Sequence, residues 1–269
     1  MYFDSHTHLN SEQLFSNSEK YLESFESMWG KALVNVAVDL DRAKKALQIS
    51  KNNNTSLKVL STIGFHPWLI WNNDICSNNF DFLINQAEDF LKENKEYTYA
   101  IWECGIDTHY DNWKSLEDQK SFFDMQCALA EKYNLPIVIH SRDDFYSTLE
   151  VLKKYPNLKI YFHCWWYWKK EVNILQESFK NVWIGYTWNI TFPKADNIRE
   201  SLLSTNKQNI LMETDAPYLA PQVHRGQMNM PEYVKYIYEY SSELLSMNLE
   251  DYQKQIKENF QNFFSIKIN

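Results

Sequence analysis

Short apolar runs recur along the chain, and each is followed by a longer segment with the spacing of an amphipathic helix. Near-continuous apolar runs are typical of strands that are covered by other elements on both faces. Eight runs therefore predict strands, at Tyr2–Asp4, Ala32–Val38, Leu57–Ile63, Tyr99–Trp102, Pro136–Ile139, Lys159–Phe162, Val182–Gly185 and Asn209–Met212.

Apolar residues three and four positions apart predict helices in the intervening segments. The clearest examples are Leu22, Phe25 and Trp29, and then Phe122, Met125, Leu129 and Tyr133. Two further helices are predicted near Pro231–Leu245 and Glu250–Phe264.

Repeated strand–helix units imply right-handed crossovers and a parallel sheet. Eight units in 269 residues match the TIM-type (β/α)8 barrel of the α/β class. An open, doubly wound sheet is the alternative. Because no linker, low-complexity tract or shift in composition interrupts the pattern, we expect one domain over residues 1–269.

Composition narrows the class of protein. Apolar residues make up 44% of the chain, which is typical of a globular protein. A net charge of −8 argues against a broad basic face for nucleic acid, although bound divalent cations can reverse the charge locally. The four cysteines form no C-x-x-C pair, and no secretory or membrane-spanning apolar stretch is present, so we expect a cytoplasmic protein with reduced thiols.

Imidazole and carboxylate side chains follow the predicted strands. In a barrel, the carboxyl ends of the strands meet at one mouth, where active sites form. The side chains at these points that could bind a metal are His6, His8, Glu103, His140, His163 and Asp215. This set exceeds the needs of one ion. Two ions sharing one bridging carboxylate, about 3.5–4 Å apart, would leave open positions for water.

Other residues near the strand ends have weaker signals. His66 precedes Pro67 and is predicted to position substrate or to cap its loop. His109 fits an exposed loop, and His224 contacts either substrate or nothing. Glu213 lies two positions before Asp215 and is expected to stand behind the ligands.

Six motifs carry a resemblance to a known family. They are Phe3–His8, Gly64–Pro67, Glu103–Asp107, Pro136–Asp143, Phe162–Cys164 and Met212–Pro221, which continues into Arg225-Gly226 and Asn229–Pro231. In this order they resemble the TatD family of metal-dependent deoxyribonucleases, within the amidohydrolase-type barrels. The E-T-D-A-P-Y-L-A-P run is the most specific of them, and the resemblance spans nearly the whole chain.

The resemblance implies a distribution of two divalent ions. It assigns one ion to His6, His8 and Asp215, and the other to His140 and His163, with Glu103 as the bridge. It further implies hydrolysis of phosphodiester bonds in DNA, at single strands or strand ends, by a metal-activated water. Glu103 and Asp215 would be the catalytic residues, since Asp215 can also accept a proton from that water.

Substrate contacts are predicted less directly. Under the resemblance, Arg225 and Asn229 lie in the loop that holds substrate or closes the mouth. Arg142 could bind a phosphate in a bidentate manner, or form a salt bridge with Asp143 or Asp144 instead.

The chain departs from the family pattern in two places. Trp102 stands where the family usually has Gly, and Trp165-Trp166-Tyr167 replaces the usual Phe-Ser-Gly. Indoles at the mouth could stack on a base, a contact worth about 1–3 kcal/mol, or they could simply pack under loops. The tryptophans that could join such a rim are Trp68, Trp71, Trp168 and Trp188.

Two other functions are open. An amidohydrolase-type enzyme would cut a C–N or ester bond in a small molecule, but relatives of that kind often use a modified lysine on the fourth strand, where this chain has Glu103. The second alternative is a barrel that has lost its enzymatic activity, and the intact set of candidate ligands argues against it. For the metal, the four imidazoles favour zinc, manganese or cobalt, whereas the resemblance favours magnesium.

Overall fold

Eight parallel strands form one sheet that curls into a nearly closed barrel. The computed structural model describes residues 1–71, 77–109 and 116–268. The strands are β1 (Tyr2–Thr7), β2 (Gly30–Asn35), β3 (Lys58–Ile63), β4 (Thr98–Asp107), β5 (Ile137–Arg142), β6 (Ile160–Phe162), β7 (Val182–Tyr186) and β8 (Ile210–Met212). They pair in the order of the chain, and a bridge between Thr7 and Ala216 joins the two edges. The predicted (β/α)8 barrel is therefore confirmed over the open sheet.

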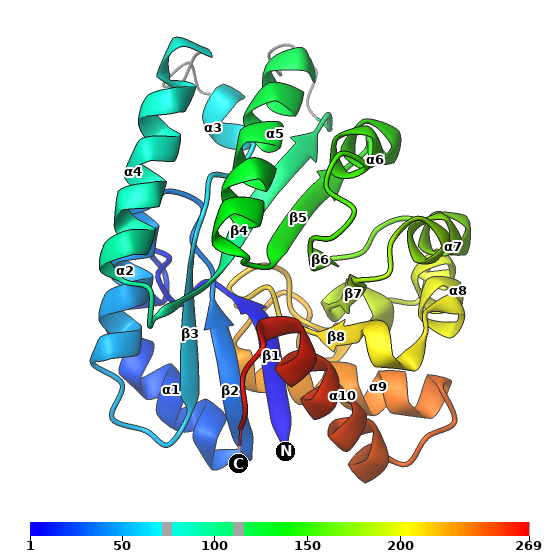
Figure 1. The fold of residues 1–269 in the computed structure, drawn as a ribbon. Helices are drawn as coiled ribbons and strands as arrows, with labels where there is room; N and C mark the ends of the chain where they lie inside the picture. The colour runs from blue at the N-terminus through cyan, green and yellow to red at the C-terminus, as the bar shows by residue number, and fades with distance from the viewer. Residues whose placement is uncertain (72–76, 110–115, 269) are drawn as a thin grey trace.

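Helices surround the strands (Figure 1). They are α1 (Ser18–Ser27), α2 (Leu40–Lys51), α3 (Trp68–Trp71), α4 (Phe80–Glu93), α5 (Leu116–Tyr133), α6 (Phe145–Leu152), α7 (Lys169–Ser178), α8 (Asp196–Ser204), α9 (Val234–Leu244) and α10 (Leu249–Phe264). One predicted helical position is wrong. Trp29 lies beyond the end of α1 with φ 75° and is 73% exposed, because the chain turns there into β2.

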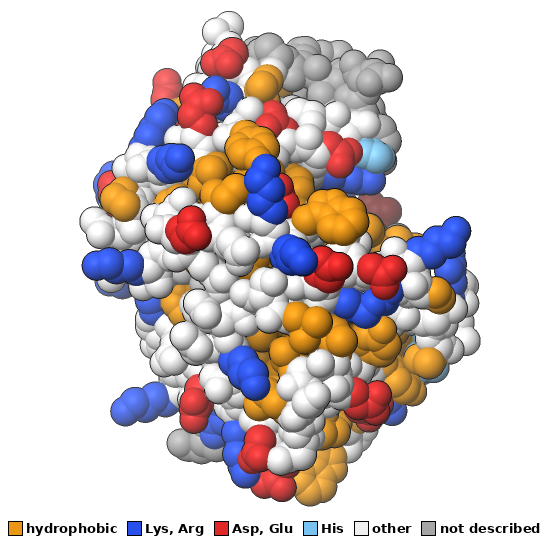
Figure 2. All heavy atoms as spheres, turned by 90° about the vertical axis from the view of Figure 1, so that its right-hand side faces the viewer, with side chains coloured by type: hydrophobic (Ala, Val, Ile, Leu, Met, Phe, Trp, Pro, Cys, Tyr) orange, Lys and Arg blue, Asp and Glu red, His pale blue; other side chains and the backbone are white. Residues whose placement is uncertain are grey.

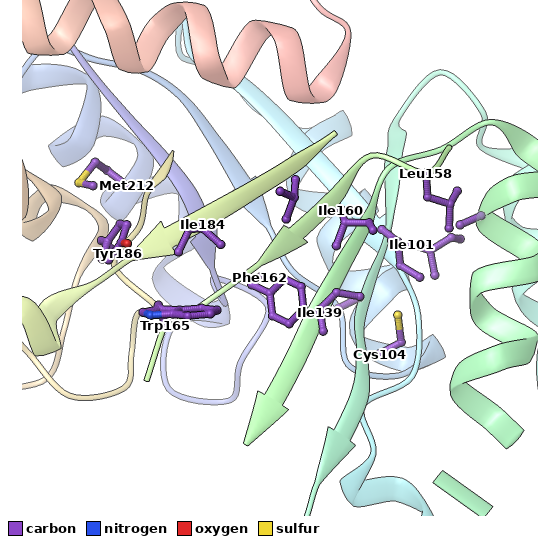
Figure 3. Close-up of a cluster of buried hydrophobic side chains, with 14 of the residues drawn as sticks. Ile101, Cys104, Ile139, Leu158, Ile160, Phe162, Trp165, Ile184, Tyr186 and Met212 are labelled. Carbon is purple, nitrogen blue, oxygen red and sulfur yellow. The ribbon is translucent and has the colours of Figure 1, made fainter. Parts of the chain in front are cut away.

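Strand residues alternate between two apolar layers, as the pleat requires. Leu33 faces the outer layer between strands and helices, whereas Ala32 and Val34 face the barrel interior. Figure 3 shows part of the outer layer. Phe260 and Phe264 of α10 reach into the interior layer beside Phe3 of β1. These side chains fill the barrel, so the interior is a packed core rather than a channel.

Strand β4 contains the main departure from the predicted boundaries. The sequence predicts that this strand ends at Trp102, directly before Glu103, but its pairing with β5 continues to Asp107. The register shifts between Ile101 and Cys104, and Glu103 has φ 57°. A bulge of this kind re-aims a side chain without ending the strand. Gly105 follows with φ +147°, where a Cβ would lie 2.0 Å from the His140 backbone oxygen.

The surface of the molecule carries mixed charge (Figure 2), and its described cysteines are unpaired. Figure 2 shows acidic, basic and apolar side chains interspersed on the face that it draws. Cys104, Cys127 and Cys164 are buried and free, while Cys76 lies outside the described residues. Within the described ranges, no helix combines the length and apolarity needed to cross a membrane.

Candidate metal centre

The six predicted ligands converge at one end of the barrel. His6 and His8 lie at the end of β1, Glu103 in β4 and His140 in β5. His163 directly follows β6, and Asp215 lies three residues beyond β8. Four of the six are buried, and His140 and Asp215 are partly exposed. Parallel strands bring these positions together because their carboxyl ends share one rim.

Three of the six form a first donor group. The Nε2 atoms of His6 and His8 are 3.0 Å apart, and each is 3.4 Å from Asp215 Oδ1. Asp215 reaches this place from a turn with φ 58°, in which its N–H donates to the His6 carbonyl at 2.8 Å. Asp4 anchors the same turn by accepting from the backbone N–H and the hydroxyl of Thr214.

The other two histidines form a second donor group. His163 Nε2 lies 3.4 Å from His140 Nδ1. The other nitrogen of His140, Nε2, is 2.9 Å from Asp107 Oδ2, which directs Nδ1 toward the cluster. A carboxylate on the outer nitrogen of a histidine is the usual support of a metal ligand. Asp107 was not assigned a role from the sequence, although it closes the Glu103–Asp107 motif.

Glu103 lies between the two groups. Its Oε1 is 3.9 Å from His6 Nε2 and 3.5 Å from His163 Nε2, and its Oε2 is 3.7 Å from His8 Nε2. Oε2 is buried and has no hydrogen-bond partner among the described residues. Burial raises the pKa of Glu103 to about 7. A buried carboxylate oxygen without a donor, surrounded by imidazole nitrogens, fits a divalent cation.

Burial and mutual repulsion also act on the histidines. The pKa values of His6, His66 and His163 fall well below their usual range, first through desolvation and then through the neighbouring imidazoles. Desolvation also lowers the pKa of His8, but Glu103 and Asp215 outweigh it and raise the net value. Neutral imidazoles are the form that binds metal.

Glu213 stands behind the donor groups, as expected. It is fully buried; Oε1 accepts from the Cys164 N–H at 2.6 Å, and Oε2 accepts from the Tyr161 hydroxyl. The same carboxylate lies 3.8 Å from His163 Nδ1 and 4.0 Å from His6 Nδ1. It therefore supports the rear of two predicted ligands and does not face the cavity.

The remaining three histidines differ in their distance from the donor groups. His66 lines the mouth, with Nε2 4.0 Å from Glu103 Oε1, and its Nδ1 accepts from the Trp68 N–H at 3.0 Å. It thus both faces the centre and caps its loop. His109 is paired with Asp143 on the surface. The ring of His224 stacks on Tyr233 and lies outside the cavity lining.

A cavity of 590 Å³ opens above the donor groups. Three of the predicted substrate contacts line it, namely His66, Arg142 and Trp166. Arg42 and Tyr218 line it as well, and the sequence did not single them out. Arg42 lies in the first turn of α2, where Asp39 caps the helix and pairs with the guanidinium.

The other three predicted contacts lie elsewhere. Trp165 is 1% exposed and packs in the outer apolar layer, as Figure 3 shows. Asn229 is buried and donates to the carbonyls of Thr214 and Leu219. Arg225 lies over the ring of Phe192, with its Cζ 5.0 Å from the ring centre. Asn229 therefore shapes the loop that carries Asp215, whereas Trp165 belongs to the core.

The chain matches the family model described as TatD related DNase over residues 3–265. It belongs to the TatD family of metal-dependent hydrolases.

Individual relatives agree with this family. A metal-dependent hydrolase of Mycoplasma genitalium is 33% identical over 270 residues, with 98% of each chain covered. A human 3'-5' RNA nuclease is 34% identical over 125 residues, which are 46% of this chain and 16% of the nuclease. The crystal structure of a TatD homologue from Escherichia coli has a TM-score of 0.88 at 21% identity and covers 99% of this chain and 98% of its own. The resemblance inferred from the motifs is thus confirmed.

The departures from the TatD pattern fall in three environments. Trp102, expected at the mouth, lies instead inside the barrel under the donor groups and is fully buried. Trp165 is in the outer core, and only Trp166, 46% exposed, faces the cavity.

The other tryptophans of the predicted rim also differ from one another. Trp68 and Trp188 line the cavity, whereas Trp168 is exposed at the start of α7 and does not. The side chain of Trp71 lies outside the described part of the chain.

Proposed function

We propose that this TatD-family chain is a two-metal phosphodiesterase that hydrolyses DNA, acting on single strands or strand ends. The observation that carries the proposal is the position of Glu103, whose two oxygens face both donor groups. A single carboxylate between two imidazole sets is the arrangement that a bridged metal pair requires.

His6, His8 and Asp215 would hold one ion, and His140 and His163 the other. Bound divalent ions supply a water of lowered pKa and stabilise charge on the attacking and leaving oxygens. The Asp215 side chain is 13% exposed, against 7% for Glu103, so it is the carboxylate more open to the cavity. It is therefore placed to accept the proton of the attacking water. Asp107 keeps the His140 ring in its binding orientation.

Replacing Asp107 by asparagine should weaken metal binding about 10–100-fold, because the carboxylate behind His140 is lost while the ring remains. Metal titration of the chelated protein measures this. Asp143→Asn removes an exposed carboxylate that pairs with His109 and is the matched control. Equal affinities in the two variants would leave Asp107 without a role in binding.

The cavity wall supports a nucleic-acid substrate. Arg42 follows β2 and Arg142 ends β5, and both line the cavity, so two guanidinium groups stand at its rim where phosphates flanking the cleaved bond would lie. Trp166 follows β6, across the barrel from β2, and its ring meets the Trp188 ring edge-on at 5.5 Å. An exposed indole braced by a buried one offers a rigid surface on which a base can stack.

Trp166→Ala should weaken binding of a short single-stranded oligonucleotide about tenfold, because base–aromatic stacking contributes about 1–3 kcal/mol. Fluorescence anisotropy under non-cleaving conditions, with the metal left out, measures the affinity. Trp168→Ala is the control, since that indole is also exposed, at 57%, two residues away but lies outside the cavity lining. If both variants bind like the parent protein, the stacking role is refuted.

The decisive assay incubates the purified protein with end-labelled single-stranded DNA and Mg²⁺, Mn²⁺ or Zn²⁺. We expect shortening from a strand end that stops on chelation. An RNA strand of the same sequence belongs in the assay, because the human relative is named as an RNA nuclease. Turnover of a small amide or lactone without cleavage of either strand would favour the amidohydrolase alternative. Metal analysis of protein purified without chelator identifies the native ion. The predicted cytoplasmic location stays a prediction.

A further inference from the structure

Each of the four histidines in the centre has one ring nitrogen directed inward and one directed outward. A neutral imidazole carries a single proton. When the inward nitrogen binds a metal, the outward nitrogen must therefore be an N–H donor, and it needs an acceptor. The group behind each ring thus indicates whether that histidine is prepared to bind.

Two of the rings have a hydrogen-bond acceptor behind them, and a third faces no donor. His140 faces the Asp107 carboxylate at 2.9 Å. His8 is hydrogen-bonded to the backbone of Val36. His163 Nδ1 is buried and has no hydrogen-bond partner among the described residues, with Glu213 Oε1 3.8 Å away, so no donor opposes a proton on it. In these three histidines the proton can therefore lie on the outward nitrogen, which leaves the inward nitrogen with a lone pair for an ion.

His6 is different. Its outward nitrogen, Nδ1, lies 3.2 Å from Trp102 Nε1, and both side chains are fully buried. An indole N–H can only donate, so His6 Nδ1 must accept and the His6 proton must be on Nε2. Nε2 lies 3.0 Å from His8 Nε2, which accepts its proton, and 3.4 Å from Asp215 Oδ1. In this tautomer His6 has no lone pair directed at an ion.

The Trp102 ring has little freedom to leave. It stacks on Phe264 with an interplanar angle of 4° and meets Tyr161 edge-on. The alternative acceptor for His6, Glu213 Oε2, is 4.0 Å away and already accepts from the Tyr161 hydroxyl. Moving the His6 proton to Nδ1 would thus set two buried N–H donors against each other.

We propose that Trp102 gives the two metal positions unequal affinities. The position formed by His140 and His163 fills first. The position formed by His6, His8 and Asp215 binds its ion about tenfold more weakly than it would without the indole N–H behind His6. The inference rests on the proposed two-metal centre. Its consequence is a protein that holds one ion at low metal concentration and becomes fully loaded only as the metal concentration rises.

Trp102→Phe tests this, because it removes the indole N–H and keeps an aromatic ring in the interior layer. Calorimetric titration of the chelated full-length protein with Mn²⁺ should show one tighter and one weaker site in the parent chain. In the variant, the weaker site should tighten about tenfold while the tighter site changes less than twofold. Trp183→Phe is the matched control, since that indole lies in the same interior layer and its Nε1 has no hydrogen-bond partner among the described residues.

The His6 tautomer supplies a second readout that does not depend on metal or activity. Nitrogen-15 NMR of the chelated protein, with His6 assigned through a His6→Asn variant, should find the proton on Nε2 in the parent chain and on Nδ1 to an increased extent in Trp102→Phe. Two equal sites in the parent chain, or the same tightening in both variants, would overturn the inference. A single bound ion would contradict the two-metal centre and not the role of Trp102. In that case the His6 tautomer tests Trp102 separately, and a proton on His6 Nδ1 in the parent chain would refute its effect.

Discussion

Replacing Glu103 by alanine is expected to remove both ions and to slow hydrolysis on the order of a thousandfold, which corresponds to about 4 kcal/mol of barrier. The reason is geometric. Its Oε1 faces His6 and His163 from the two donor groups, and its Oε2 faces His8. Without this carboxylate, Asp215 would be the one anionic member left in the two donor groups, and two divalent ions would face each other with less negative charge between them.

The measurement is the metal content per chain after dialysis against a weak chelator, together with the rate on end-labelled DNA. Glu117→Ala is the control, because Glu117 is an exposed carboxylate in the first turn of α5 that pairs with Lys120 and does not line the cavity. Circular dichroism checks that the barrel is intact. If Glu103→Ala retains two full equivalents of metal, Glu103 is not the bridge.

Asp215→Asn is expected to lower kcat by about 10²–10⁴-fold, the usual contribution of a positioned general base, with a smaller loss of metal than Glu103→Ala causes. Asparagine keeps the volume and one oxygen beside His6 and His8, but an amide cannot accept the proton of the attacking water. The hydrogen bonds that hold this turn involve Asp4, Thr214 and the Asp215 backbone, and all of these remain in the variant.

Two readouts separate the chemical role of Asp215 from a ligand role. Single-turnover rates at saturating metal report the proton transfer, and metal titration reports the affinity. A rate within tenfold of the parent chain would reassign the base to another group. A large loss of affinity whose effect on rate is fully recovered by excess metal would make Asp215 a ligand only.

The positions of the strands and of the candidate ligands followed from the sequence because both depend on local signals. Buried parallel strands must be continuous apolar runs, and the end of each run marks the rim of a barrel. For that reason the sequence alone predicts that His6, His140 and His163 lie at one mouth. Glu103 was placed correctly at the rim, but its strand was ended too early, since a bulge with positive φ leaves no clear pattern in the residue types.

Tertiary structure alone decided what the tryptophans do. Trp165 and Trp166 are neighbours in the chain, yet one is in the core and the other faces the cavity. The sequence could not separate them because they follow β6 in a non-helical segment, where no period assigns a face. Trp102 has a periodic position in β4, but its effect on His6 depends on which atom of the indole reaches which atom of the imidazole.

The sequence by itself determined the barrel, its eight strands and the set of donor side chains at the rim, because hydrophobic period and residue type act over a few neighbouring positions. Only the tertiary structure decided the support of those donors, since Asp107, Glu213 and Trp102 reach their histidines from other strands. Hydrogen bonds across a barrel depend on register and ring orientation, which no local pattern records. The physical reason is the sequence distance over which each effect acts. Hydrophobic patterns involve neighbouring residues, whereas the proton position on each imidazole is set by contacts between distant parts of the chain.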